Sequence, residues 1–119
     1  MYPSVSFKMV AKAVEFFLRD CPEEDKVLAQ SCLDMIKFGM GNTLITFGGK
    51  YWEYGGVPDV YEKGLTIGGY ESAFLADLVA AYVLENTQQF FDEAKFFGIY
   101  RDDGLVVFNS YPANSSIWN

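Results

Sequence analysis

Two adjacent carboxylates, Asp102 and Asp103, are the residues of this sequence best suited to chemistry, and they lie at the turn of a predicted hairpin. Successive strand residues point to opposite faces, so one carboxylate can face a cleft while the other flanks it. Together with a third carboxylate, such hard oxygen ligands suit Mg²⁺ or Mn²⁺, which keeps waters and substrate phosphates as further ligands. The alternative is an ordinary turn, because tight turns select Asp and Gly.

The composition excludes several other chemistries. The 119 residues include no histidine, which rules out Ser-His-Asp and Cys-His catalysis and His-ligated zinc. Cys21 and Cys32 alone cannot form a zinc site, and we expect both as reduced thiols packed as small apolar residues. With 9 basic and 16 acidic side chains the net charge is −7, which argues against a free-standing nucleic-acid binder because phosphates require clustered Lys and Arg.

The sequence predicts three helices, two in its first third and one after its midpoint. Ser4 or Ser6 can cap a first helix, whose apolar residues recur every three or four positions and which ends near Asp20. A second helix is predicted over residues 22–38, because a proline and several acids stand at its start and glycines follow its end. A third, long and rich in alanine, is predicted over about residues 70–94.

Two β-hairpins complete the predicted fold. The expected strands are residues 43–47, 51–54, 96–100 and 105–108. Glycine-containing turns over residues 48–50 and 101–104 connect them, and residues 55–58 form a loop. The sequence therefore predicts an α+β fold, an incomplete antiparallel sheet of two hairpins packed against about three helices over residues 1–110, with a loose tail over residues 111–119. Without an apolar leader or membrane span, we expect a soluble intracellular protein, cytoplasmic or nuclear.

A glycine pattern precedes the long predicted helix. Gly64, Gly68 and Ser72 recur at intervals of four residues, and Leu-Ala follows at 75–76. The chain also begins with Met-Tyr-Pro-Ser-Val, and the second hairpin carries Tyr-Arg-Asp-Asp at residues 100–103. These three motifs, in this order and spacing, resemble the palm of reverse transcriptases, the RNA-directed DNA polymerases. The resemblance extends from Tyr2 to about Asn109, and the Tyr-Arg-Asp-Asp turn is similar to that of certain retroelement polymerases.

The resemblance implies that Asp102 binds Mg²⁺ or Mn²⁺ directly and that Asp103 supplies a second carboxylate. Two metal ions would then activate a 3′-hydroxyl and stabilise the leaving pyrophosphate. In the family the first metal-binding Asp precedes the position of Tyr2, which would place it before Met1. We therefore expect a partial palm with little polymerase activity in isolation.

The resemblance also implies a substrate site. Tyr2 would lie under the incoming sugar and exclude a ribose 2′-hydroxyl, although core packing is an alternative role for this ring. Gly68 and Gly69 would let the backbone approach the nucleotide and the template base, where a Cβ would intrude. Ser72 could cap or line the following helix. The sequence departs from most reverse transcriptases at Thr66-Ile67, where many have Pro-Gln, and at Asp77, where many have Asn.

Other interpretations of the sequence remain open. The chain could be a non-catalytic α+β protein-interaction module, or the palm of an RNA-dependent RNA polymerase. Lys50, Tyr51 and Trp52 could form a basic and aromatic patch that stacks on nucleic acid, or they could pack within the fold. The expected partners of the parent polymerase are a template-primer and a deoxynucleoside triphosphate, with no membrane. An open sheet edge favours self-association.

Overall fold

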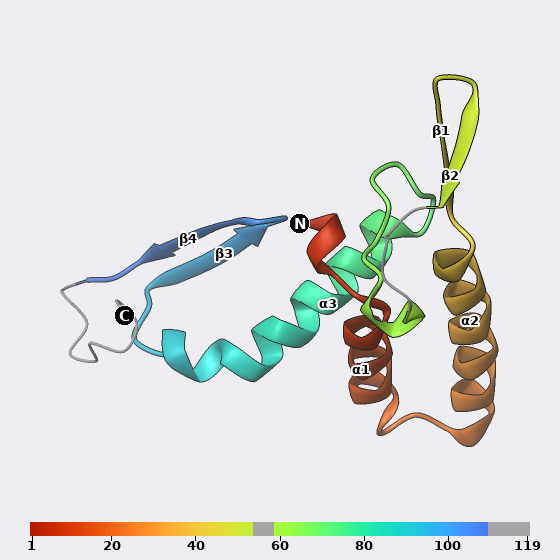
Figure 1. The fold of residues 1–119 in the computed structure, drawn as a ribbon. Helices are drawn as coiled ribbons and strands as arrows, with labels where there is room; N and C mark the ends of the chain where they lie inside the picture. Colours follow the sequence, from red (N-terminus) through yellow and green to blue (C-terminus); the bar gives the residue numbers. More distant parts are fainter. Residues whose placement is uncertain (54–58, 110–119) are drawn as a thin grey trace.

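The computed structural model describes residues 1–53 and 59–109. Its elements confirm the α+β class predicted from the sequence (Figure 1). They are η1 (Tyr2–Ser4), α1 (Phe7–Leu18), α2 (Glu23–Gly41), β1 (Leu44–Phe47), β2 (Lys50–Glu53), η2 (Val60–Glu62), α3 (Ser72–Thr87), η3 (Gln88–Phe91), β3 (Phe96–Tyr100) and β4 (Asp103–Val107). The predicted loop at 55–58 and tail at 111–119 lie outside the described residues. Within the described part, no helix is both long and apolar enough to cross a membrane.

The first two helices begin and end close to their predicted bounds. At the start of α1, Ser6 Oγ accepts a hydrogen bond from the Met9 N–H at 3.4 Å, so Ser6 is the cap. The second helix, α2, was predicted to end at residue 38 but continues through Gly39 to Gly41. Met40 is buried in the core, and this packing outweighs the poor helix propensity of the glycines.

The third helix is shorter than the sequence predicts. It ends at Thr87, and residues 88–91 form a 3₁₀ turn where the prediction had helix up to Ala94. Near its end, Asn86 Nδ2 donates to the Tyr82 carbonyl at 2.7 Å, and Thr87 Oγ1 donates to the Val83 carbonyl at 2.8 Å. Polar side chains that bond to the backbone in this way compete with continuation of a helix.

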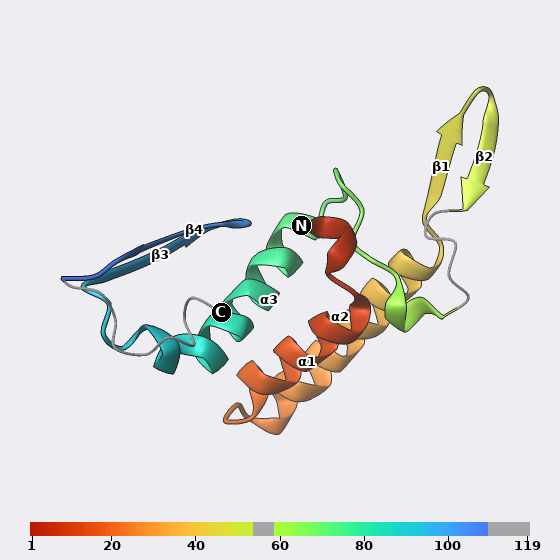
Figure 2. The ribbon, with the colours of Figure 1, turned by 60° about the vertical axis from the view of Figure 1, so that its left-hand side comes forward.

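The core lies where α1 packs against α2 and α3 (Figure 2). Its buried apolar residues are Val5, Phe7, Val10, Ala13, Met40, Leu65, Leu75, Ala76 and Val79. Leu65 is the largest side chain that is almost fully buried, at 1% exposure, although it belongs to no helix or strand. The core is therefore built from helix faces and from the segment that leads into α3.

The two hairpins form separate two-stranded antiparallel sheets, and not the single incomplete sheet that the sequence predicts. In the first, Leu44 pairs with Glu53 and Phe47 with Lys50; in the second, Phe96 pairs with Val107 and Tyr100 with Asp103. Figures 1 and 2 show the hairpins projecting from opposite ends of the helical body. Most strand residues are exposed, because each ribbon lacks a second layer against which to pack.

Candidate functional site

The N-terminal turn η1 is joined to the segment before α3 by backbone contacts. The Leu65 N–H donates to the carbonyls of Tyr2 and Val5, at 3.0 and 3.1 Å. Gly64 lies so close to Pro3 that a Cβ at this position would overlap the Pro3 backbone. Two of the three motifs in the resemblance are therefore in direct contact, and the glycine at 64 permits this close approach.

The acidic hairpin turn reaches the same region. The Met1 amino group lies 3.9 Å from Asp102 Oδ2, so the N-terminus is beside the tip of the β3–β4 hairpin (Figure 1). Arg101 Nη1 donates to Asp77 Oδ1 at 3.0 Å and to the Ala73 carbonyl at 3.4 Å, which ties the turn to the first turns of α3. All three sequence motifs thus converge at one end of α3.

The turn itself has an unusual backbone. Arg101 and Asp102 connect the paired residues Tyr100 and Asp103, and Arg101 has a φ of 56°. A non-glycine residue in this left-handed region carries steric strain, on the order of 1 kcal/mol. The two hydrogen bonds of the Arg101 guanidinium to α3 offset that strain. At the hairpin tip the Asp102 side chain is 69% exposed, and Asp103 beside it is also exposed.

The metal ligands predicted in this chain are the two carboxylates Asp102 and Asp103. In residues 1–53 and 59–109, no group of three His, Cys, Asp or Glu side chains is arranged to hold a metal ion. Asp77, near the turn, is engaged by Arg101. A pair of carboxylates fits a Mg²⁺ or Mn²⁺ ion whose remaining ligands are phosphates and waters, but it does not fit a complete two-metal centre.

The glycine loop lies directly before α3. Gly68 has a φ of 89°, which favours glycine, and a Cβ there would have no neighbour within 4 Å. A Cβ at Gly69 would lie 2.6 Å from Ser72 Oγ. The requirement for glycine at 68 in this structure is therefore one of backbone conformation, and at 69 it is one of space beside a side chain.

The predicted substrate residues Tyr2 and Ser72 both contribute to packing. Tyr2 is half-buried against the core. Ser72 is 2% exposed and is the first residue of α3, where Glu71 occupies the cap position without a side-chain hydrogen bond. Ser72 therefore does not cap the helix, and its buried hydroxyl occupies the space that a side chain at Gly69 would need.

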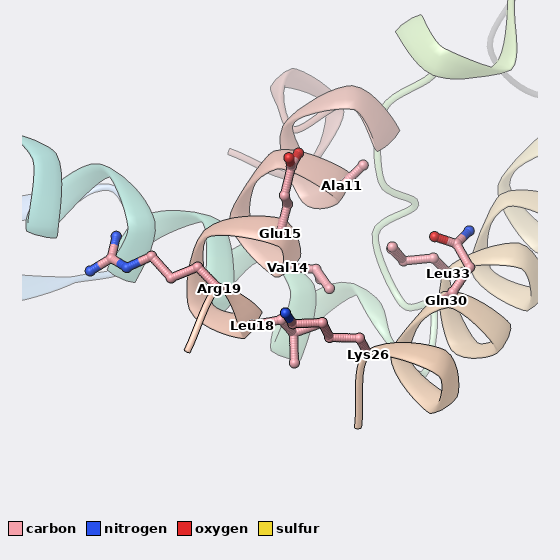
Figure 3. A pocket seen from close by; sticks show the side chains of 8 residues that line it. All are labelled: Ala11, Val14, Glu15, Leu18, Arg19, Lys26, Gln30 and Leu33. Carbon is pink, nitrogen blue, oxygen red and sulfur yellow. The ribbon is translucent and has the colours of Figure 1, made fainter. Parts of the chain in front are cut away.

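One surface hollow adjoins the acidic turn, and another lies away from it. One, of about 360 Å³, lies between α3 and β3 and is lined in part by Asp77, Tyr100 and Arg101, so it adjoins the acidic turn. The other, of about 470 Å³, lies between α1 and α2 (Figure 3). Its lining includes Glu15 and Arg19 but none of the residues predicted for the site. The geometry thus favours the first hollow as part of the site.

The ion pair between Arg101 and Asp77 is the feature of the site that sequence reasoning missed. The sequence shows Asp77 only as a departure from the family pattern, and Arg101 only as part of the Tyr-Arg-Asp-Asp motif. A signal was nevertheless present, because the helix carries an acid where many family members have a neutral amide, and the turn carries a basic residue. Opposite charges on two elements that the resemblance brings together predict a contact between them.

Replacing Asp77 by Ala is expected to lower the free energy of unfolding by only about 0.2–1 kcal/mol, because the ion pair is partly exposed. The larger expected effect is local: the turn loses its tie to α3, so hydrogen exchange at the turn amides accelerates. The matched control is Asp20→Ala, which removes an acid paired only with its neighbour Arg19. Equal exchange at the turn in both variants would contradict the role of the pair.

Comparisons with protein-family models, with curated proteins and with solved structures gave no significant match. The function of this chain is therefore inferred from its own residues and from how they are arranged.

Proposed function

We propose that this chain is part of the palm of an RNA-directed DNA polymerase, and that its site binds a deoxynucleoside triphosphate with Mg²⁺ or Mn²⁺. One observation carries the proposal: segments far apart in the sequence that resemble three palm motifs meet at one end of α3. Met1 lies 3.9 Å from Asp102, Arg101 bonds to α3, and Leu65 bonds to Tyr2. An ordinary turn would not require these contacts.

Different residues of the site would bind the metal, the sugar and the base of the nucleotide. Asp102 and Asp103 are exposed acceptors that would share a metal ion with the triphosphate. When bound there, the metal would neutralise phosphate charge and polarise the reacting phosphoryl group. Tyr2 is the candidate for rejecting a ribose 2′-hydroxyl, and Gly68 and Gly69 line the approach to the base.

The proposal also accounts for the small number of carboxylates at the site. Nucleotidyl transfer by two metals needs a third carboxylate, and the resemblance puts it a few residues before the position of Met1. Any residues joined to Met1 would start beside Asp102, given the 3.9 Å separation of the two charged groups. We accordingly propose that Asp102 and Asp103 without a third carboxylate bind the metal–nucleotide complex weakly. We also propose an intracellular location, in the cytoplasm or the nucleus, where nucleic-acid strands and deoxynucleoside triphosphates occur together.

Calorimetric titration of the 119-residue chain with dTTP in the presence of Mn²⁺ tests the proposal. We expect binding that depends on Mn²⁺ and that weakens at least about tenfold in the Asp102→Asn, Asp103→Asn double variant, since the loss of charge-assisted ligands is worth about 1.4 kcal/mol or more. The matched control is Glu23→Gln, Glu24→Gln, which removes two acids from the exposed start of α2. Equal weakening in both double variants would contradict the site.

The preference for deoxyribose or ribose in the bound nucleotide distinguishes the two polymerase classes. An RNA-directed DNA polymerase predicts tighter binding of dTTP than of the ribonucleotide rTTP, and Tyr2→Ala should reduce that preference. A preference for rTTP would instead support the palm of an RNA-dependent RNA polymerase. The exposed apolar residues of α2, among them Met35 at 75% and Phe38 at 73%, favour the other alternative, a protein-interaction module. A protein-interaction module would bind neither dTTP nor rTTP.

A further inference from the structure

The first hairpin, β1–β2, carries aromatic side chains that the fold leaves uncovered. Phe47 is 77% exposed, Tyr51 76% and Trp52 54%. The sequence allowed these residues to pack inside the fold, but all eight strand residues of this hairpin are exposed. Uncovered apolar surface on a projecting element marks a site of interaction.

The strand register sorts the hairpin side chains onto two different faces. Paired residues share a face and alternate along each strand, so Ile45, Phe47, Lys50 and Trp52 lie together. We call these four residues the stacking face. The opposite face carries Leu44, Thr46, Tyr51 and Glu53. Aromatic rings and a lysine are thus combined on one side of the ribbon.

The turn and the strand contacts hold this ribbon in shape. Gly48 and Gly49 both have positive φ, 60° and 74°, as in the type I′ turns that match the twist of a hairpin. Trp52 Nε1 donates to the Phe47 carbonyl at 3.4 Å, which restrains the indole across the strands. The Trp52 indole is therefore restrained on the same side of the ribbon as the exposed Phe47 ring.

The positive and negative side chains of the hairpin lie on opposite faces of the ribbon. Glu53 is the hairpin's one acid, and it lies on the opposite face, bonded to the buried Lys63 Nζ at 3.0 Å. Lys63 also donates to the Gly41 carbonyl at 3.4 Å. The stacking face therefore carries the positive charge of Lys50 and no negative charge, in a chain whose net charge is −7.

We propose that the stacking face binds single-stranded nucleic acid, with bases stacked on Phe47 and Trp52 and a phosphate near Lys50. Stacking on aromatic rings with a neighbouring basic side chain is how proteins bind single strands without reading their sequence. The net charge of −7 disfavours every acidic occupant, a nucleic-acid strand and a second copy of this chain alike, so the choice of a single strand depends on the local positive charge of Lys50 beside the two uncovered rings. The choice of nucleic acid over an acidic protein rests on the proposed function, whose template is a nucleic-acid strand.

The fluorescence of Trp52 tests this proposal directly. Trp118→Phe leaves Trp52 as the only tryptophan of the chain. Titration of this protein with oligo(dT) or oligo(rU) is expected to quench Trp52 emission. Phe47→Ala should weaken binding by about 5- to 150-fold, the effect of losing one stacked base. Lys50→Gln should reduce the slope of log K against log salt by about 0.7, the value for one phosphate contact on a single strand.

The controls separate the possible failures. Tyr51→Ala removes an equally exposed ring from the opposite face and should leave binding unchanged. No quenching, or equal losses in Tyr51→Ala and Phe47→Ala, would overturn the proposal. It would also be overturned if poly-glutamate quenched as strongly as the oligonucleotides, or if emission depended on protein concentration alone, because these outcomes identify an acidic protein or a second copy.

The test is independent of the acidic turn. Oligonucleotide binding is measured without divalent metal, so it does not require a metal ion at the acidic turn. If the chain binds dTTP with Mn²⁺ but no oligonucleotide, the hairpin proposal fails and the proposed nucleotide site stands. If it binds oligonucleotide but no nucleotide, the reverse holds.

Discussion

Replacing Leu65 by Ala is expected to lower the free energy of unfolding by about 2–5 kcal/mol, the range for deleting a large buried aliphatic side chain. Leu65 is 1% exposed and lies in the core between residues of all three helices. The Leu65 N–H donates to the Tyr2 and Val5 carbonyls, and these bonds limit how far the segment can move to fill the cavity. The loss should therefore fall in the upper part of that range.

Urea unfolding followed by circular dichroism measures this loss. The matched control is Ile67→Ala, two residues along the same segment, where the side chain is 75% exposed. Its expected effect is within about 0.5 kcal/mol of zero, as for most surface substitutions. Similar losses for both variants would show that the segment before α3 is not part of the core.

Gly64→Ala is expected to have an effect nearly as large, for a different reason. Its Cβ would overlap the Pro3 backbone, which cannot rotate away as a side chain could. Accommodation requires that η1 move off the segment before α3, breaking the hydrogen bond between Leu65 and Tyr2. Overpacking of this kind costs about 3 kcal/mol. The same movement would separate Met1 from Asp102.

A glycine in open space provides the control for this substitution. Gly39 lies inside α2 and a Cβ there would have no neighbour within 4 Å. Gly39→Ala should therefore stabilise the protein by about 0.5–1 kcal/mol, since alanine is the better helix former. If Gly64→Ala were equally stabilising, the close contact between η1 and the segment before α3 would be absent in solution.

The fold could be predicted from the sequence where local rules suffice. Helix periodicity and a serine cap predicted α1, and the glycine turn between two aromatic or β-branched runs predicted the first hairpin. The second hairpin was predicted with too long a turn, because Arg101 and Asp102 alone connect its strands, and Asp103 and Gly104 pair within the sheet. Local rules could not show that α3 stops at Thr87, because Asn86 and Thr87 bond to the backbone only once the helix exists. Nor could they show that the two hairpins stay apart, since pairing between distant strands depends on the whole chain.

The candidate site could be predicted in part. The sequence identified the acidic turn, the glycine loop and the N-terminal turn as separate motifs. It could not supply the contacts between them, because those depend on the Arg101 ion pair with Asp77 and on the close approach at Gly64. The burial of Ser72 was also beyond its reach, since a hydroxyl at the start of a helix is equally suited to a surface cap or to the core.

The central claim is that the acidic turn, η1 and the start of α3 form one metal–nucleotide site. Paramagnetic broadening by Mn²⁺ in the ¹⁵N spectrum of the chain, recorded with dTTP present, tests it most directly. The claim predicts that the amides of Asp102, Asp103, Tyr2 and Ser72 broaden first and together. Broadening confined to the acidic start of α2 at residues 23–25, or to Asp102 and Asp103 without Tyr2 and Ser72, would contradict it.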